Sequence, residues 1–314
     1  MALAIGVDLG GTKIAAGVVD ENGVIVASNR RPTPSLSSEA VISAITELVL
    51  ELRNDHEASA VCVAAPGFVD AARSTLMFTP NLPMRNEPLG ARLSESIGLP
   101  VLIENDANAA AWGEARFGAA QGKANAVLLT VGTGLGGGII VDNRLVRGAF
   151  GFAAEVGHMT LIPDGLECGC GQRGCWEQYT SGNALLRNAR QLAAQQRAEA
   201  HRLLSHGDGT PEGIQGQHIT LAAEAGCPVA ITAFNQIGEQ LGRGMATVSA
   251  LLDPEVFVIG GGVCEAGELL LAPIRAEFEV RLTARAHRPL PAIVAATLGN
   301  DAGIVGAADL ARQG

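Results

Sequence analysis

A histidine and three cysteines lie close together in the segment GHMTLIPDGLECGCGQRGCWEQ; they are His158, Cys168, Cys170 and Cys175. One imidazole and three thiolates form a four-ligand set of the kind that closes a structural Zn²⁺ site. Glycines between the cysteines let the chain turn tightly around an ion. The alternative is a set of reduced, unligated cysteines, but three so close together in a cytosolic chain rarely pack as plain apolar residues. The pattern predicts a structural zinc site.

Asn105 and Asp106 follow a predicted buried strand and precede a predicted helix, in the segment IENDANAAAWGE. Enzymes of the α/β class keep much of their chemistry at the carboxyl ends of strands. In phosphoryl transfer an aspartate orients the attacking hydroxyl and accepts its proton. In a plainer interpretation, Asp106 caps the helix, which is a common role for aspartate at that position.

Glu155 and Glu177 flank the cysteine-rich segment. Either acid could be an ordinary surface residue. Beside a zinc site, however, both would be fixed in place and suited to hydrogen-bonding several hydroxyl groups.

Two glycine-rich turns have the composition of a phosphate site. The first lies in IGVDLGGTKIAAGVVD and the second in VLLTVGTGLGGGIIVD, and each joins two apolar strands. Glycine lets a ligand approach the backbone, and free N–H groups in such turns bind anions. Hydroxyls and an ammonium nearby favour phosphate, although a plain hairpin connection is the alternative for either turn alone. The residues concerned are Gly10, Gly11, Thr12 and Lys13 in the first turn and Gly132, Thr133 and Gly134 in the second.

Two further features suit a nucleotide. Asp8 ends the first strand and is either an acid at the edge of the core or a holder of Mg²⁺, directly or through water, since that ion favours carboxylate with phosphate. Gly260, Gly261 and Gly262 follow the predicted strand EVFVIGGGV. They either form a strand-end turn or let the backbone lie close to an adenosine.

Two common nucleotide-binding motifs are excluded. Gly132-x-Gly134-x-x-Gly137 matches the dinucleotide-binding pattern, which needs a helix directly after the glycines. Here the β-branched run from Ile139 to Val141 predicts a strand instead. The sequence also contains no GxxxxGK[ST] loop.

The order of apolar periodicities predicts an α/β fold. Strands are expected at 4–9, 13–20, 24–30, 59–67, 101–106 and 255–263, and on both sides of the turn within 126–146. Helices are expected at about 38–53, with Ser37 or Ser38 as N-cap, and at 107–117, 182–204, 228–252 and 301–312. A Pro-rich loop with TPNLP at 79–83 and a surface loop without chemistry at 205–218 are also expected.

The two glycine hairpins form an internal repeat of strand, glycine turn, strand and closing Asp. They open the two halves of the chain, and the length also suggests roughly two domains. The repeat predicts a duplicated domain whose facing turns hold one ligand.

The composition excludes several classes of partner. The 314 residues are 47% hydrophobic with a net charge of −10, and no Lys/Arg cluster is present, which argues against nucleic acid. No apolar run reaches the roughly 20 residues of a membrane span, and no targeting segment is visible. We therefore expect a cytoplasmic protein that binds neither membrane nor nucleic acid. Cys62, Cys227 and Cys264 are isolated and are expected to be small core residues.

Together the motifs resemble the ROK family of sugar kinases and sugar-responsive repressors. The segments that carry the likeness occur in the family's order and span the chain: GVDLGGTK, ENDANAAAWGE, TVGTGLGGGII, EVGHM, CGCGQRGCWEQYTSG and VIGGGV. The likeness is greatest to the family's ATP-dependent glucokinase branch, especially its actinobacterial type.

The resemblance implies the actin-like ATPase (ribonuclease H-like) fold, with two α/β domains around a central cleft. ATP would lie across the glycine turns and a sugar deep between the domains. The domains are expected at 1–117 and 118–300, the latter with the zinc-binding loop. The last helix, at about 301–314, would pack back on the N-terminal domain.

The resemblance also implies roles for single residues. Asp106 would be the catalytic base for the sugar 6-hydroxyl, and His158 would both bind sugar and ligate zinc, so that the ion orients it. Thr12 and Thr133 would contact phosphates. The sugar would be bound by Gly67, Asn81, Asn105, Asp106, Glu155, His158 and Glu177. Homodimers or homotetramers are common in the family.

The expected reaction is the MgATP-dependent phosphorylation of D-glucose at its 6-hydroxyl. N-acetylmannosamine, N-acetylglucosamine, mannose and fructose remain alternative acceptors, and polyphosphate an alternative donor, although the family's polyphosphate enzymes usually lack the cysteine cluster. A ROK repressor needs a helix-turn-helix segment before the first hairpin. That hairpin begins at residue 4 and the chain is acidic, so this alternative is the least favoured.

Overall fold

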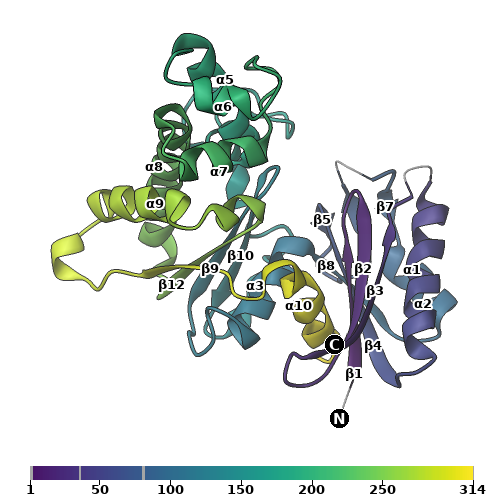
Figure 1. Cartoon of the computed structure of the whole chain (residues 1–314). Coiled ribbons are helices and arrows are strands. Elements are labelled where there is room, and N and C mark those ends of the chain that lie inside the picture. Colours follow the sequence, from purple (N-terminus) through teal and green to yellow (C-terminus); the bar gives the residue numbers. More distant parts are fainter. Residues whose placement is uncertain (1–2, 35–36, 80–81, 314) are drawn as a thin grey trace. The chain divides into compact units, whose positions relative to one another are not determined.

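Figure 1 shows the computed structural model, which describes residues 3–34, 37–79 and 82–313. The chain divides into two compact units. Unit 1 comprises residues 1–128, 137–154 and 296–314, and unit 2 comprises 129–136 and 155–295. The domain boundaries expected from the sequence stay a prediction.

Unit 1 is built on a five-stranded sheet of order β3-β2-β1-β4-β8. The first three strands form an antiparallel meander, whereas β4 and β8 run parallel to β1. The candidate residues Asp8, Gly67 and Asn105 lie at or just after the carboxyl ends of β1, β4 and β8, which meet at one edge of the sheet because these strands are parallel. The strands are β1 (Leu3–Leu9), β2 (Lys13–Val19), β3 (Ile25–Pro32), β4 (Ala58–Ala65) and β8 (Val101–Asn105).

Helices cover both faces of this sheet (Figure 1): α1 (Ser38–Arg53) and α2 (Leu89–Ile97) on one, α3 (Asp106–Phe117) and α10 (Ala302–Ala311) on the other. The expected N-cap of α1 is confirmed, since the Ser37 side chain accepts from the Ala40 N–H. The helix α10 lies so close to β1 that a Cβ on Gly6 would be 1.9 Å from the Ile304 carbonyl oxygen. Only glycine fits there.

A small antiparallel sheet of order β5-β6-β7 follows β4: β5 (Phe68–Val69), β6 (Leu76–Phe78) and β7 (Arg85–Glu87). The sequence had predicted only a loop in this region. These strands are two or three residues long, and so short a run carries no readable periodicity. The helix α2 was also missed, although its buried residues Leu89, Leu93 and Ile97 recur at the i, i+4 spacing of a helix.

A second five-stranded sheet has the order β11-β10-β9-β12-β13. The chain passes from one unit to the other within β9 (Ala126–Val131) and β10 (Leu135–Val141). The remaining strands are β11 (Arg144–Leu145), β12 (Val256–Gly260) and β13 (Ala292–Ala295). A strand therefore follows the second glycine turn, which confirms that the dinucleotide-binding motif does not apply.

Unit 2 is rich in helices: α4 (Glu177–Thr180), α5 (Gly182–Gln195), α6 (His201–Ser205), α7 (Gly216–Glu224), α8 (Pro228–Leu252) and α9 (Glu268–Arg281). Short 3₁₀ segments are η1 (Val156–His158), η2 (Gly262–Ala266) and η3 (Arg285–His287), with η4 (Gly299–Asp301) in unit 1. The expected strand at 255–263 ends earlier, because the chain turns into η2 at Gly262. The expected loop at 205–218 already contains the first turn of α7.

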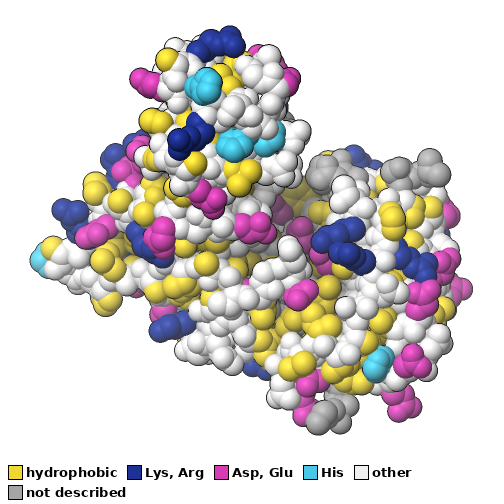
Figure 2. Space-filling view, in the orientation of Figure 1, with side chains coloured by type: hydrophobic (Ala, Val, Ile, Leu, Met, Phe, Trp, Pro, Cys, Tyr) yellow, Lys and Arg dark blue, Asp and Glu magenta, His cyan; other side chains and the backbone are white. Residues whose placement is uncertain are grey.

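On the face shown in Figure 2, basic side chains occur singly or in small groups among acidic ones. This mixed pattern agrees with the acidic composition. Among the described residues, none of the helices has both the length and the apolar character needed to cross a membrane.

Candidate active site and metal centre

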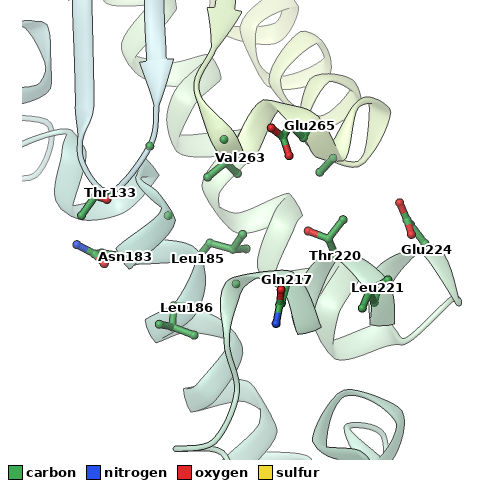
Figure 3. Close-up of a pocket in the computed structure, with 15 residues that line it drawn as sticks. Thr133, Asn183, Leu185, Leu186, Gln217, Thr220, Leu221, Glu224, Val263 and Glu265 are labelled. Atoms are coloured by element: carbon green, nitrogen blue, oxygen red, sulfur yellow. The ribbon is translucent and has the colours of Figure 1, made fainter. Parts of the chain in front are cut away.

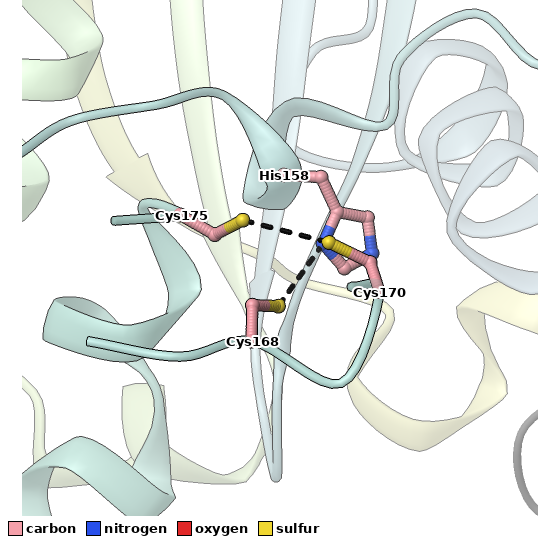
Figure 4. A group of neighbouring side chains, drawn as sticks. All are labelled: His158, Cys168, Cys170 and Cys175. Atoms are coloured by element: carbon pink, nitrogen blue, oxygen red, sulfur yellow. Dashed lines mark hydrogen bonds between the residues drawn. The ribbon is translucent and has the colours of Figure 1, made fainter. Parts of the chain in front are cut away.

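His158, Cys168, Cys170 and Cys175 converge in unit 2 (Figure 4), and their ligand atoms all lie within 4.8 Å of one another. The Sγ of Cys168 is 3.7 Å from Nδ1 of His158, and the Sγ atoms of Cys170 and Cys175 are 3.6 Å apart. Around a tetrahedral zinc ion with Zn–S bonds of about 2.3 Å, the sulfurs lie roughly 3.8 Å apart. The four residues therefore fit a zinc ion in both chemistry and spacing.

Backbone pairing and a close glycine crossing shape this loop. Cys175 forms a β-bridge with Thr160, and Glu167 forms another with Arg173. At Gly174, φ is +76° and a Cβ would lie 1.7 Å from the carbonyl oxygen of Ile162, so only glycine fits the crossing of the two segments. Burial raises the pKa of the Cys168 thiol to about 12. Since zinc binds thiolates, loading the site must release protons.

Glu155 and Glu177 stand on two sides of the His158 ring. An oxygen of Glu155 is 4.0 Å from Nε2, and an oxygen of Glu177 is 3.7 Å from Nδ1. Glu177 also accepts a hydrogen bond of 3.0 Å from the Cys168 thiol, and a Cβ on Gly134 would lie 2.7 Å from its other oxygen. One carboxylate thus joins the metal cluster to the second glycine turn.

In unit 1, Asn105 and Asp106 begin α3 directly after β8. The Asn105 Oδ1 accepts from the Asn108 N–H at 3.0 Å, and its Nδ2 donates to the Gly67 carbonyl at 3.1 Å. Asn105 is therefore the N-cap, and the interpretation of Asp106 as N-cap is wrong. The cap ties the start of α3 to Gly67 and leaves Asp106 as the first residue of the helix.

Burial, together with the negative charge of Asp8, raises the pKa of Asp106 from 3.8 to about 6. Asp8 is the last residue but one of β1, and burial likewise raises its pKa, which the positive charge of Lys13 opposes. Two carboxylates with raised pKa values at one sheet edge are typical of a functional site. In the turn after β1, Gly11, Thr12 and Lys13 are exposed, while Gly10 is held by Thr33, whose hydroxyl donates to the Gly10 carbonyl.

A cavity of about 850 Å³ lies wholly in unit 2 (Figure 3). Thr133 of the β9–β10 turn and Asn183 of α5 lie at one end of it, Gln217 and Thr220 of α7 at another, and Glu265 of η2 along a third side. This volume suits a nucleotide-sized ligand. Its lining residues are Gly132, Thr133, Gly182, Asn183, Leu185, Leu186, Gly216, Gln217, Thr220, Leu221, Glu224, Gly262, Val263, Glu265 and Ala266.

Only some of the residues predicted to bind a nucleotide line this cavity. Gly132, Thr133 and Gly262 line the cavity, whereas Gly134 faces Glu177, and Gly260 and Gly261 belong to the end of β12 and the residue after it. Asn81 lies outside the described residues. The walls supplied by α5 and α7 were not predicted, because their lining residues have no spacing that distinguishes them from an ordinary amphipathic helix.

The sequence matches the ROK family over residues 4–314. The chain belongs to the ROK family. It is 52% identical over 313 residues to a glucokinase of Streptomyces coelicolor, and the aligned residues cover 100% of this chain and 98% of that protein. It is 37% identical to a glucokinase of Thermotoga maritima, over 98% of this chain and 97% of that one.

Among solved structures, a ROK family glucokinase from Streptomyces griseus, in complex with glucose and AMPPNP, has a TM-score of 0.90 and 51% identity over 100% of both chains. This ROK chain accordingly has the two-domain, actin-like ATPase fold expected from the sequence.

Proposed function

We propose that this ROK protein is an ATP-dependent glucokinase, which converts MgATP and D-glucose to ADP and glucose 6-phosphate. The observation that carries the proposal is the 52% identity, over the whole chain, to a protein named as a glucokinase. The cavity in unit 2 and the perturbed carboxylates in unit 1 supply what such a reaction needs: a place for a nucleotide and a base.

Asp106 is assigned as the general base. As the oxygen of the 6-hydroxyl bonds to the γ-phosphorus, the bond from that phosphorus to the β–γ bridging oxygen breaks, and the hydroxyl proton passes to the Asp106 carboxylate. With a pKa of about 6, this carboxylate is mostly ionised at neutral pH and still basic enough to accept a proton. Its place at the first turn of α3 fixes its direction.

The phosphates are assigned to the two glycine turns, Gly10 to Lys13 in unit 1 and Gly132 to Gly134 in unit 2. Asp8 is assigned to hold the Mg²⁺ that accompanies ATP, directly or through water. That ion supplies charge neutralisation at the phosphate oxygens. The half-buried position of Asp8 at the end of β1 and the ammonium of Lys13 suit this role.

Sugar hydroxyls are assigned to Glu155, His158 and Glu177 in unit 2. Gly67, Asn81 and Asn105 of unit 1 are assigned to the same ligand. Zinc on the four-residue cluster would hold the His158 ring by Nδ1 and leave Nε2–H as a hydrogen-bond donor. Because Glu177 follows Cys175 by two residues, zinc on the cluster would also fix the backbone that carries this second sugar-binding side chain.

The charge of the cavity favours ATP over polyphosphate as donor. Among the described residues that line it, none is Lys, Arg or His, whereas Glu224 and Glu265 are both present. A long polyanion in this cavity would meet two carboxylates without a compensating cation. The base and ribose of ATP carry no charge, so the two carboxylates would not repel them.

The proposal is tested by a coupled assay of the purified chain with glucose, mannose, fructose, galactose, N-acetylglucosamine and N-acetylmannosamine, each with ATP and with polyphosphate. The largest kcat/KM is expected for glucose with ATP. A larger value for another hexose would make the chain a different ROK kinase, and no transfer to any of them would refute a kinase.

A cytoplasmic location and a homodimer or homotetramer complete the proposal. Six free cysteines fit a reducing compartment. Light scattering on the eluate of a sizing column would measure the assembly, and a monomeric mass would contradict it.

A further inference from the structure

Glu104 is a buried acid between two arginines, in the strand β8 just before Asn105 and Asp106. Only 2% of it is exposed. Its Oε2 accepts from Nε of Arg147 at 2.6 Å and lies 3.4 Å from Nε of Arg73. Two guanidinium groups and one carboxylate are costly to bury unless the geometry holds them tightly.

The other oxygen of Glu104 faces the start of α3. Its Oε1 accepts from the Asn105 backbone N–H at 3.1 Å and from Nδ2 of Asn108 at 3.2 Å. Asn108 is 1% exposed, and its own N–H is the group that the Asn105 side chain caps. Glu104 thus holds both partners of the capping bond: Asn105, which precedes Asp106, and Asn108, which follows it.

Both arginines are themselves held in place. The backbone φ of Arg73 is +58°, which is uncommon for any residue other than glycine. The Arg73 carbonyl accepts from the Ile103 N–H of β8 at 2.8 Å. Arg147 follows β11, and its carbonyl accepts from the Ala153 N–H at 3.0 Å. Two loops with hydrogen-bonded backbones therefore bring two positive charges to the same carboxylate.

We propose that Glu104 is a positioning residue, which holds the Asn105–Asp106 turn in the orientation that catalysis needs, with Arg147 and Arg73 holding Glu104. This inference rests on the proposed function, because it acts through the base of that reaction. Neither arginine is assigned any contact with substrate.

The three hydrogen bonds that Glu104 accepts explain why a carboxylate is needed. Two N–H groups from the cap donate to Oε1 and Nε of Arg147 donates to Oε2, beside the positive charge of Arg73, and an ionised carboxylate accepts at both oxygens. An amide accepts at one end only. In Glu104→Gln the NH₂ group must therefore face either the cap donors or the guanidinium groups, so the turn or the arginines have to move.

A second buried acid in unit 1 supplies a matched control. Asp309 of α10 is 4% exposed and accepts from Arg116 at 3.1 Å, from Arg312 at 3.0 Å and from the Trp112 indole at 2.8 Å. It also sits between two arginines, but Arg116 lies ten residues, or roughly 15 Å of helix, beyond Asp106. Asp309→Asn makes the same chemical change without touching the cap.

The experiment compares kcat and KM of wild type, Glu104→Gln and Asp309→Asn, per folded protein and at a temperature below each unfolding transition. We expect kcat of Glu104→Gln to fall about 10- to 100-fold, since a small misplacement of a catalytic group has that cost. Its KM for ATP should stay within about twofold of wild type, and Asp309→Asn should keep a kcat within about twofold. Equal kcat in the two variants would overturn the proposal.

A second pair keeps the test decisive if Glu104→Gln does not fold. Arg147→Lys retains the charge but loses the Nε donor, and Arg116→Lys is its match at Asp309. We expect kcat to fall several-fold in Arg147→Lys only, and wild-type kcat in that variant would then refute the inference. Failure of the proposed function is a separate result, because the wild-type chain would then transfer phosphate to no hexose.

Discussion

Unit 1 and unit 2 differ in the kind of chemistry that their residues offer. Unit 1 has two carboxylates with raised pKa values, Asp8 and Asp106, at the carboxyl ends of parallel strands. Unit 2 has a large cavity and a closed ligand set for a metal ion. We expect the reacting base in unit 1, and the nucleotide cavity and the metal site in unit 2. Variants of the base should lower kcat, and variants of the cavity or the metal site should mainly raise KM.

The largest effect is expected from Asp106→Asn. An amide cannot accept the hydroxyl proton, so kcat should fall about 10³- to 10⁴-fold, at the upper end of what general base catalysis contributes. Glucose binding, measured by calorimetry, should change little. Near wild-type turnover would show that Asp106 is not the base.

Thermal unfolding of the same variant separates catalysis from folding. Because the native pKa of Asp106 lies above 3.8, the native state binds this proton more tightly than the unfolded chain. The resulting stability is present below pH 3.8 and is lost as the pH rises through about 6. Asp106→Asn should therefore be at least as stable as wild type at pH 8. A lower Tm there would point to a folding defect.

Removal of the metal from unit 2 should weaken glucose binding and lower the Tm. A zinc-free sample, prepared with a chelator or as Cys170→Ser, should bind glucose about 10- to 100-fold more weakly, because His158 and Glu177 lose their support. Its Tm should fall as well. For the chelated wild type, added zinc should restore both. Unchanged KM for glucose in a sample verified as metal-free would contradict the assignment of these two side chains.

The pH dependence of kcat tests unit 1 without a substitution. Only ionised Asp106 can act as base, so kcat should be constant above its pKa of about 6 and fall tenfold per pH unit below it. At pH 5 the rate should be about a tenth of that at pH 8. A flat profile down to pH 5, with ATP and glucose saturating, would exclude this carboxylate.

The smallest effect is expected from Gln217→Ala on α7. Its side chain lines the cavity but is exposed, so the KM for ATP should rise only a few-fold, with the KM for glucose unchanged. Gln195→Ala, at the end of α5 and outside the cavity lining, is the control and should change neither. A change confined to glucose would place the nucleotide elsewhere.

The sequence predicts best where a function depends on neighbours in the chain. The convergence of the four candidate metal ligands, both glycine hairpins and the Ser37 cap were predicted, since each is a local pattern with its own geometry. The ROK motifs also predicted the fold.

Features that depend on distant residues were missed. Nothing in the spacing of Arg73 and Arg147 indicates that they meet at Glu104. Gln217 of α7 lines the cavity from within the segment 205–218, which was expected to be a surface loop without chemistry. The hydrogen bond from the Asn105 amide to the Gly67 carbonyl, which lies far away in sequence, was not predicted either.

The most direct test of the central claim is a structure of the chain with glucose and a non-hydrolysable ATP analogue both bound. We expect an Asp106 carboxylate oxygen within hydrogen-bond reach, about 2.6–3.2 Å, of the glucose 6-hydroxyl oxygen, and the nucleotide in the cavity lined by Thr133 and Gln217. An Asp106 turned away from that hydroxyl, or a nucleotide bound outside the cavity, would contradict the account.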